Sequence, residues 1–366
     1  MGFRCGIVGL PNVGKSTLFN ALAGTAAAES ANYPFCTIEP NTGRVAVPDA
    51  RLARLTEFAK SASTVPTYLE FVDIAGLVAG ASKGEGLGNK FLAHIREVDA
   101  ICQVLRCFAD EEISHVAGVV DPISDAETVE TELMLADLES LERRIEGLIK
   151  RARGGDKDSK LSLALAERAA DALRDGKPAR TVGVTADEQS LWRQMQLLTA
   201  KPVLYVCNVD EDSAVTGNQW SEQVAAKAAR EGAECVVISA AIEAEIAQLA
   251  TVEERQEFLS SLGLEETGLA RLIRAGHELL GLITFFTAGP KESRAWTIPA
   301  GTRAGAAAGV IHSDFERGFI CAETIAYDDY IGAGSEQAAK DAGRMRQEGR
   351  DYTVADGDVI LFRFNV

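Results

Sequence analysis

Short apolar runs recur through the first 240 residues, separated by stretches with helical spacing. They cover residues 3–8, 68–74, 100–108, 202–209 and 235–239. Their length and nearly unbroken apolar character are typical of parallel strands that are buried on both faces. Together with the helical patterns between them, the first at 15–22, they predict an α/β domain with a doubly wound, mostly parallel sheet.

Between residues 108 and 202 the apolar spacing changes to that of a coiled coil. Apolar side chains recur at steps of four and three residues, at Met134, Leu138, Leu141, Ile145 and Leu148. The run 151–156 interrupts this pattern, and Leu161, Leu165 and Ala169 begin a second helix. An antiparallel helical hairpin, inserted in the α/β domain and tipped by a flexible loop, is therefore expected.

After about residue 280 the pattern becomes that of short strands with turns between them. The expected strands lie at 282–286, 295–298, around Ile311, at 318–325 and at 358–364. We therefore assign the α/β domain to residues 1–125 and 200–280, the hairpin to 126–199, and a small strand-rich domain to 281–366.

Charge and cysteine content narrow the class of protein. Lys and Arg number 37 against 54 Asp and Glu, so the net charge is −17, which disfavours binding a polyanion such as DNA through the whole surface. No apolar run reaches the roughly 18 residues of a membrane span, and no signal-peptide pattern opens the chain. The seven cysteines contain no CxxC pair. A cytoplasmic protein with reduced thiols and no membrane partner is expected.

Residues 9–16 carry the strongest chemical signal. Their sequence, GLPNVGKS, matches G-x-x-x-x-G-K-[ST] between an expected strand and an expected helix. In such a loop the backbone N–H groups surround phosphates, and the helix dipole favours the negative charge. Lys15 is expected to reach the β- and γ-phosphates, and the Ser16 hydroxyl to bind Mg²⁺.

Three further positions are candidates for the metal and for hydrolysis. Asp73 ends an expected strand and can hold Mg²⁺ through water, and Thr37 can offer its hydroxyl when the γ-phosphate is present. Leu77 occupies the position at which many GTPases carry a water-orienting glutamine. His115 can supply that missing group, although a loop histidine with a local hydrogen bond is an equally good interpretation.

The end of the strand 202–209 is where the base should lie. Guanine-binding domains of this class use Asn-Lys-x-Asp, whose carboxylate accepts hydrogen bonds from guanine. Here the corresponding residues are Asn208, Val209, Asp210 and Glu211. The altered motif favours ATP, while Asp210 leaves the strictness of that preference open.

Taken together, these motifs resemble those of the Obg-like ATPases of the YchF type. The segments that carry the resemblance are GLPNVGKST, NYPFCTIEPN, DIAGLVAGASKGEGLGNKFL, HVAGVVDP, the Asn208–Glu211 loop and the terminal GDVILFRFNV. The resemblance covers essentially the whole chain. It implies a P-loop G domain, an inserted antiparallel coiled coil and a C-terminal TGS domain of β-grasp type.

The resemblance also implies ATP hydrolysis in preference to GTP hydrolysis, and association with ribosomes. Carried over by position, the phosphates would be held by Asn12, Val13, Gly14, Lys15, Ser16 and Thr17. Asn208 and the Val209 backbone would hold adenine, and Ser16 and Thr37 would hold Mg²⁺. Some relatives with a hydrophobic residue at the glutamine position bind K⁺ through the Asn of the phosphate loop, which here is Asn12. The matching motif strengthens His115 as the catalytic candidate.

Basic side chains gather around the expected hairpin tip: Arg143, Arg144, Lys150, Arg151, Arg153, Lys157 and Lys160. This cluster is a candidate contact with ribosomal RNA, the alternative being a solvated helix end. The leading hypothesis is an ATPase switch that acts on translation or in its regulation under stress. Two alternatives stay open, namely a GTPase of ribosome assembly and a nucleotide-gated binding module whose hydrolysis is incidental.

Overall fold

The computed structural model describes residues 3–30, 41–74, 87–110, 119–154 and 156–365. The described residues divide into two compact units. The first contains residues up to 25, residues 41–43 and those between 70 and 272, and the second contains residues 26–30, 44–69 and 273–365. None of the helices in these described ranges is long and apolar enough to cross a membrane.

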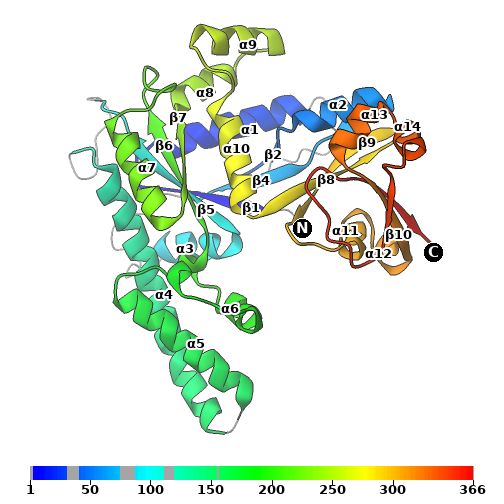
Figure 1. Ribbon diagram of the computed structural model, residues 1–366. Coiled ribbons are helices and arrows are strands. Elements are labelled where there is room, and N and C mark those ends of the chain that lie inside the picture. The colour runs from blue at the N-terminus through cyan, green and yellow to red at the C-terminus, as the bar shows by residue number, and fades with distance from the viewer. Residues whose placement is uncertain (1–2, 31–40, 75–86, 111–118, 155, 366) are drawn as a thin grey trace. The chain divides into compact units, whose positions relative to one another are not determined.

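A six-stranded sheet forms the centre of the first unit (Figure 1). Its strands lie in the order β2 (Thr42–Ala46), β4 (Tyr68–Asp73), β1 (Arg4–Val8), β5 (Ala100–Cys107), β6 (Val203–Val209) and β7 (Glu234–Ile238). The pairs β1–β4, β1–β5, β5–β6 and β6–β7 are parallel. Every residue of β5 and β6 is buried, as their apolar runs predicted.

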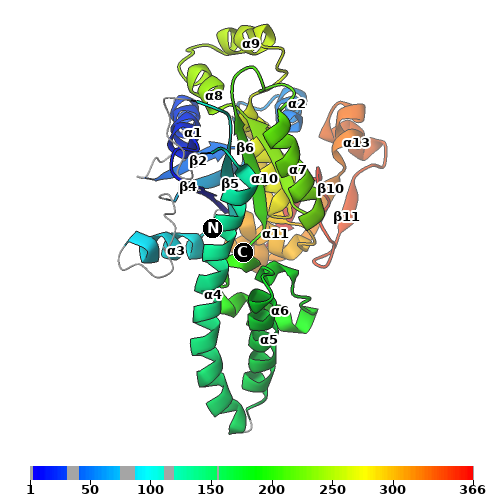
Figure 2. The same cartoon turned by 90° about the vertical axis from the view of Figure 1, so that its left-hand side faces the viewer.

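Helices flank this sheet on both sides, with α1 and α7 on opposite faces (Figure 2). The helices are α1 (Lys15–Ser30), α3 (Leu87–Glu97), α7 (Gln219–Glu231), α8 (Ala240–Ile246), α9 (Val252–Ser261) and α10 (Gly268–Leu279), the first and last of which continue into the second unit. Local sequence sets their ends. For example, the Asn218 side chain caps α7 by accepting from the N–H groups of Trp220 and Ser221, and Gly232 ends the helix with a positive φ. The predicted doubly wound domain is confirmed.

The predicted hairpin consists of α4 (Pro122–Arg153) and α5 (Lys157–Arg174). Asp121 caps α4 ahead of a proline in the first turn, and Asp156 caps α5. The interruption is shorter than the expected run 151–156, because the helix continues through Arg153 and ends at Gly154. Arginine has a high helix propensity and glycine a low one, which places the end of α4 at the glycine.

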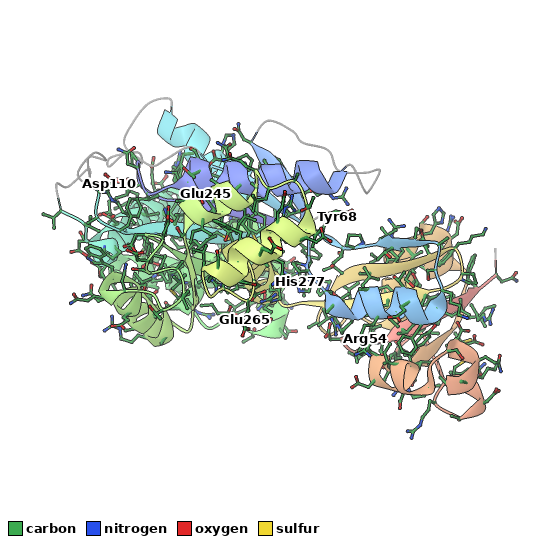
Figure 3. All side chains as sticks on the ribbon, turned by 90° about the horizontal axis from the view of Figure 1, so that it is seen from above. Arg54, Tyr68, Asp110, Glu245, Glu265 and His277 are labelled. Atoms are coloured by element: carbon green, nitrogen blue, oxygen red, sulfur yellow. The ribbon has the colours of Figure 1, made fainter. Side chains whose placement is uncertain are left out.

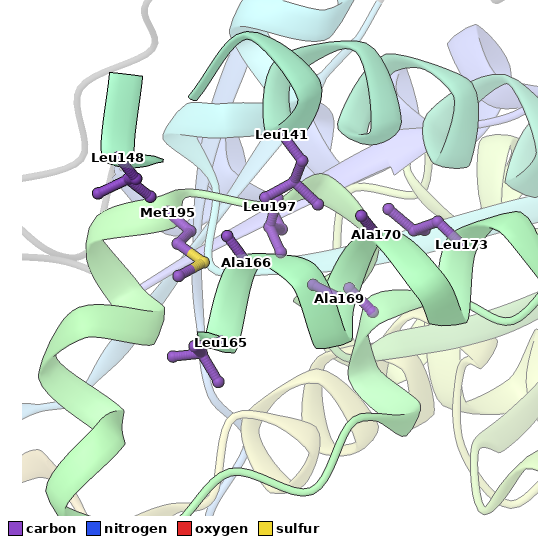
Figure 4. Close-up of a cluster of buried hydrophobic side chains, with 10 residues drawn as sticks. Leu141, Leu148, Leu165, Ala166, Ala169, Ala170, Leu173, Met195 and Leu197 are labelled. Atoms are coloured by element: carbon purple, nitrogen blue, oxygen red, sulfur yellow. The ribbon is translucent and has the colours of Figure 1, made fainter. Parts of the chain in front are cut away.

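The two hairpin helices enclose an apolar core (Figure 4). Leu141 and Leu148 of α4 contribute to the same buried cluster as Leu165 and the alanines of α5, while Met134, Leu138 and Ile145 pack against it. The predicted apolar seam is therefore confirmed. Leu161, expected at the start of the second helix, lies within α5 and is 50% exposed. The return to the sheet passes through η1 (Ala179–Thr181), η2 (Ala186–Glu188), α6 (Gln189–Met195) and η3 (Leu198–Ala200).

The second unit contains a mixed six-stranded sheet. The strand order is β11 (Arg346–Glu348), β10 (Phe319–Ile325), β12 (Val359–Phe364), β8 (Leu282–Ala288), β9 (Glu292–Pro299) and β3 (Ser63–Val65). A parallel pair, β12–β8, lies between the antiparallel pairs β10–β12 and β8–β9. This arrangement agrees with the expected β-grasp domain. Its helices are α2 (Ala50–Ala59), α11 (Ala304–Ile311), α12 (Ser313–Arg317), α13 (Tyr327–Ala333) and α14 (Glu336–Asp341).

Two features of this unit differ from the sequence-based expectation. The strand expected around Ile311 is wrong, because this residue ends the alanine-rich helix α11, in which Ala304, Ala307 and Ala308 are buried. In addition, α2 and β3 come from the part of the sequence assigned to the α/β domain. Leu52 and Leu55 of α2 share a buried cluster with Phe286, and β3 pairs with β9.

Candidate functional site

The phosphate loop links β1 to α1, and its glycines make close approaches that a side chain would prevent. A Cβ atom at Gly9 would lie 2.5 Å from the Val104 carbonyl oxygen. At Gly14, where φ is +94°, it would lie 2.2 Å from the Asn208 amide nitrogen. The first helical bond of α1 joins the Leu18 N–H to the Gly14 carbonyl at 3.0 Å. The loop is thus held tightly at the N-terminus of a helix, the geometry that binds phosphates.

Lys15 and Asp73 are the charged groups behind this loop. Lys15 is only 8% exposed, and its ammonium donates to the Leu10 carbonyl at 2.6 Å. Burial lowers the pKa of Lys15, and the negative charge of Asp73 opposes that shift. Burial likewise raises the pKa of Asp73 while Lys15 lowers it. Each group therefore stabilises the charged form of the other at the end of β4, where β4 and β1 are neighbours.

Asn208 holds two walls of the site together. Its amide nitrogen donates to the Val13 carbonyl of the phosphate loop at 3.0 Å, and its oxygen accepts from the Ala240 N–H at 2.9 Å. The side chain is 5% exposed. Asn208 thereby fixes the phosphate loop against the start of α8, in addition to the base contact that the sequence predicts for it.

The residues after Asn208 form the rim of the site. Val209 is buried, whereas Asp210 and Glu211 are exposed. The Asp210 carboxylate accepts a hydrogen bond from the Ser213 N–H at 2.9 Å, so one of its oxygens caps the turn that follows β6. Glu211 remains at the position that reads the base in the related Asn-Lys-x-Asp motif.

These elements enclose a cavity of about 730 Å³, a size typical of ligand sites. The predicted residues that line it are Asn12, Gly14, Lys15, Ser16, Thr17, Asn208, Val209 and Glu211. Val13 is buried beneath the loop and contributes its carbonyl to Asn208. The cavity therefore brings together the phosphate-binding and base-binding segments, which lie nearly 200 residues apart in the sequence.

Sequence reasoning missed one wall of this cavity, formed by Phe108, Ala109 and Asp110. These residues follow β5, and Figure 3 labels Asp110. Their types match no nucleotide-binding motif. The only available signal was their position after a buried parallel strand, because ligands of such sheets bind at the carboxyl ends of the strands.

Three of the predicted positions lie outside the described residues: Thr37, Leu77 and His115. Their proposed roles stay predictions. Among the residues that are described, no group of three or more His, Cys, Asp or Glu side chains could hold a metal ion. A hydroxyl at Ser16 and a carboxylate at Asp73 instead fit a Mg²⁺ ion that is bound largely by substrate phosphates and water.

Comparison with known proteins identifies relatives over the full chain. Residues 4–144 match a family model described as 50S ribosome-binding GTPase. Residues 282–365 match the C-terminal model of YchF GTPases, described as a protein of unknown function. Proteins named ribosome-binding ATPase YchF from Haemophilus influenzae and Bacillus subtilis are 58% and 56% identical, with each pair of chains covered completely.

A solved structure extends this similarity to the fold. The YchF GTPase of Schizosaccharomyces pombe is 39% identical, with a TM-score of 0.89 over 99% of this chain and 98% of the other. Sequence identity, domain composition and fold agree, and the chain therefore belongs to the YchF family.

Proposed function

We propose that this chain is a Mg²⁺-dependent ATPase that prefers ATP to GTP, associates with ribosomes and acts as a nucleotide-dependent switch. Its bacterial relatives are named ribosome-binding ATPases, which supports both the ribosome association and the ATPase activity. The cavity supports nucleotide binding through the phosphate loop, Lys15 and Asn208. The free cysteine thiols among the described residues fit the cytoplasm, where ribosomes work.

The base end of the cavity is the observation that carries the ATP preference. Val209 replaces the lysine of the guanine-binding motif and is buried, and Glu211 is one methylene longer than the aspartate that reads guanine. One Asp210 oxygen is already used by the Ser213 N–H. The paired donors of guanine thus lack their usual acceptor, whereas adenine does not present them.

Competitive equilibrium binding of ATP and GTP to nucleotide-free protein with Mg²⁺ tests this preference. We expect ATP to bind at least tenfold more tightly, equivalent to about 1.4 kcal/mol. The double variant Val209→Lys/Glu211→Asp restores the guanine-binding motif and should bring the two affinities together. Glu222→Asp, an exposed position on α7, is the matched control. Equal or tighter GTP binding by the unaltered chain would favour the GTPase alternative.

The metal and the monovalent ion are further parts of this proposal. Ser16, Thr37 and, through water, Asp73 would hold Mg²⁺, which supplies charge neutralisation of the phosphates. Asn12, which is exposed and lines the cavity, would contribute to a K⁺ site. Replacing K⁺ by Na⁺ should then slow hydrolysis, and Asn12→Ala should remove the difference between the two ions. Equal rates in both salts would contradict the K⁺ site.

Hydrolysis itself is assigned to Lys15, which stabilises the transferred phosphoryl group, and to His115, which orients the attacking water. We expect His115→Ala to reduce the hydrolysis rate at least 30-fold with less than a threefold change in ATP affinity. Ribosome association that stays unchanged through repeated cycles in this variant would favour the nucleotide-gated binding module.

The hairpin tip is the proposed contact with ribosomal RNA. Five basic side chains are exposed there: Lys150, Arg151, Arg153, Lys157 and Lys160. Arg143 and Arg144 are also exposed, but each has a partner in the protein: Arg143 pairs with Glu139 of the same helix, and Arg144 donates to the Gln194 carbonyl of α6. The exposed charges form a local positive surface on an acidic chain, as RNA binding requires.

Ribosome co-sedimentation at increasing salt tests the tip. The triple variant Lys150→Gln/Arg151→Gln/Lys157→Gln should weaken binding and lower the salt slope by about two to three units. Its control, Lys291→Gln/Lys340→Gln/Arg344→Gln, removes the same charge from exposed positions of the second unit. Equal losses in the two variants would indicate a non-specific charge effect instead of a contact at the tip.

A further inference from the structure

Arg106 is a fully buried arginine in the middle of the sheet of the first unit. It lies on β5 and is 1% exposed, the largest of the fully buried side chains. Placing a guanidinium group in a protein interior is unfavourable unless its donors are satisfied. At this buried position, the Arg106 guanidinium must therefore find hydrogen-bond acceptors within the protein.

Two of its hydrogen bonds go to the cavity wall that follows β5. The Arg106 Nε donates to the Phe108 carbonyl and its Nη2 to the Asp110 carbonyl, both at 3.2 Å. The guanidinium carbon also lies 4.7 Å from the centre of the Phe108 ring, a cation–π contact. One side chain thus fixes both the backbone and the aromatic ring of this wall.

The neighbouring side chain on the next strand holds the other walls of the same cavity. Arg106 and Asn208 are directly paired in the β5–β6 register, so their side chains leave the sheet on the same face. Asn208 binds the phosphate loop and the start of α8, while Arg106 binds Phe108 and Asp110. A second amide, that of Asn218, holds the Cys107 carbonyl at 2.7 Å.

The partners of Arg106 lie in the part of the cavity that is not formed by the phosphate loop. Phe108, Ala109 and Asp110 line the cavity together with the Asn208–Asp212 segment and Ala240–Ala241, whereas the phosphate loop lines it with residues 12 and 14–17. Aromatic rings bind nucleobases by stacking, and the position of the ring decides how well a base fits.

We propose that Arg106 is a positioning residue for the nucleobase: it holds the Phe108–Asp110 wall where the purine rests, and thereby sets base affinity without affecting phosphate binding. This inference rests on the proposed nucleotide-binding function. Lysine keeps the charge but has no planar fork, so it cannot reach both carbonyls while it lies flat on the ring.

The test compares ATP with inorganic tripolyphosphate, which has the phosphates without the base. For Arg106→Lys we expect ATP affinity, measured by calorimetry with Mg²⁺, to fall about tenfold, whereas tripolyphosphate affinity stays within twofold of the unaltered chain. The control is Arg294→Lys, another arginine stacked on an aromatic ring, 4.5 Å from the centre of Trp296 in the second unit. It should leave both affinities unchanged.

Other outcomes overturn the inference in distinguishable ways. Equal weakening of both ligands would show that Arg106 supports the whole unit and not the base wall, and no change in either would show that the wall needs no fixing. If Arg106→Lys does not fold, Phe108→Leu provides the test instead. It must reduce the difference between the affinities for ATP and for tripolyphosphate. An unaltered chain that binds ATP no better than tripolyphosphate would refute the proposed nucleotide function itself.

Discussion

The two sheets use polar side chains in different ways. In β5 and β6 of the first unit every residue is buried, and two of the polar ones, Arg106 and Asn208, form hydrogen bonds to the walls of the cavity. In β10 and β12 of the second unit burial partly alternates, and Arg363 pairs with Glu323 at 2.8 Å with half of the arginine side chain exposed.

Water explains this difference. A polar group that is buried on both sides must find its partners in the protein, and losing one partner leaves the other unpaired. Each member of an exposed pair can form hydrogen bonds to water in place of its partner, at little cost in free energy. Buried polar contacts should therefore matter several times more than exposed ones, and four measurements arranged by size test that expectation.

Asp137→Ala should give the largest loss of stability. This carboxylate of α4 is 1% exposed and accepts from the N–H groups of Leu198 and Thr199 at 2.8 Å and from the Thr199 hydroxyl at 2.7 Å. Removing it leaves three donors without an acceptor, and we expect the free energy of unfolding, measured in urea, to fall by about 3 kcal/mol. Glu139→Ala, an exposed position on the same helix, is the control and should cost less than about 0.5 kcal/mol.

Glu243 should make stability depend on pH. Burial raises its pKa to about 7, although the N–H groups of Gly268 and Leu269 oppose the shift. The folded state therefore binds this proton more tightly than the unfolded state. Its stabilisation is complete below about pH 4.5 and is lost as the pH rises to about 7.

The neutral variant Glu243→Gln lacks this contribution. Between pH 4.5 and 8 the unaltered chain should lose about 3 kcal/mol more unfolding free energy than Glu243→Gln does. Parallel stability curves for the two proteins would mean that Glu243 is ionised in the fold throughout this range.

Arg51→Met tests a half-buried ion network in the second unit. Arg51 donates to Asp49 at 2.8 Å and to Asp356 at 2.6 Å, and Asp356 also accepts from the Thr284 N–H at 2.9 Å. We expect a loss of about 1–2 kcal/mol, between the buried and the exposed cases. A loss as large as that of Asp137→Ala would show that partial exposure does not weaken such contacts.

Arg363→Ala should have the smallest effect. The pair with Glu323 is exposed on the arginine side, so we expect a smaller loss of unfolding free energy than for Arg51→Met, and one that disappears in 1 M salt. Measuring the variant at low and high salt separates this electrostatic part from lost packing. A salt-independent loss as large as that of Arg51→Met would place this pair with the buried contacts.

The parts of the fold that the sequence predicted are those that local patterns encode. The apolar runs at 100–108 and 202–209 became the central strands, and the Met134–Leu148 seam became a hairpin core. The phosphate loop was identified because its glycines and Lys15 must be adjacent in the chain to work. Asn208 was identified by its motif, but its bond to the Val13 carbonyl was not predicted.

Features that depend on contacts between distant segments were missed. Nothing near residues 50–65 indicates that α2 and β3 join the C-terminal sheet, because β3 has only three residues and its partner lies more than 220 residues away. The alanine-rich segment that ends at Ile311 has two branched apolar residues at its end. These suggested a strand, whereas burial of three alanines against the sheet favours a helix.

By itself, the sequence determined the fold class, the phosphate loop, the hairpin and the family, because spacing and turn chemistry are short-range properties of the chain. The tertiary structure decided which wall completes the cavity and which side chains hold it. Arg106 and Phe108 carry no motif, and their use follows from the parallel pairing of β5 with β6. That pairing places the ends of two buried strands side by side, where the buried arginine binds the backbone and the ring of the wall that follows β5.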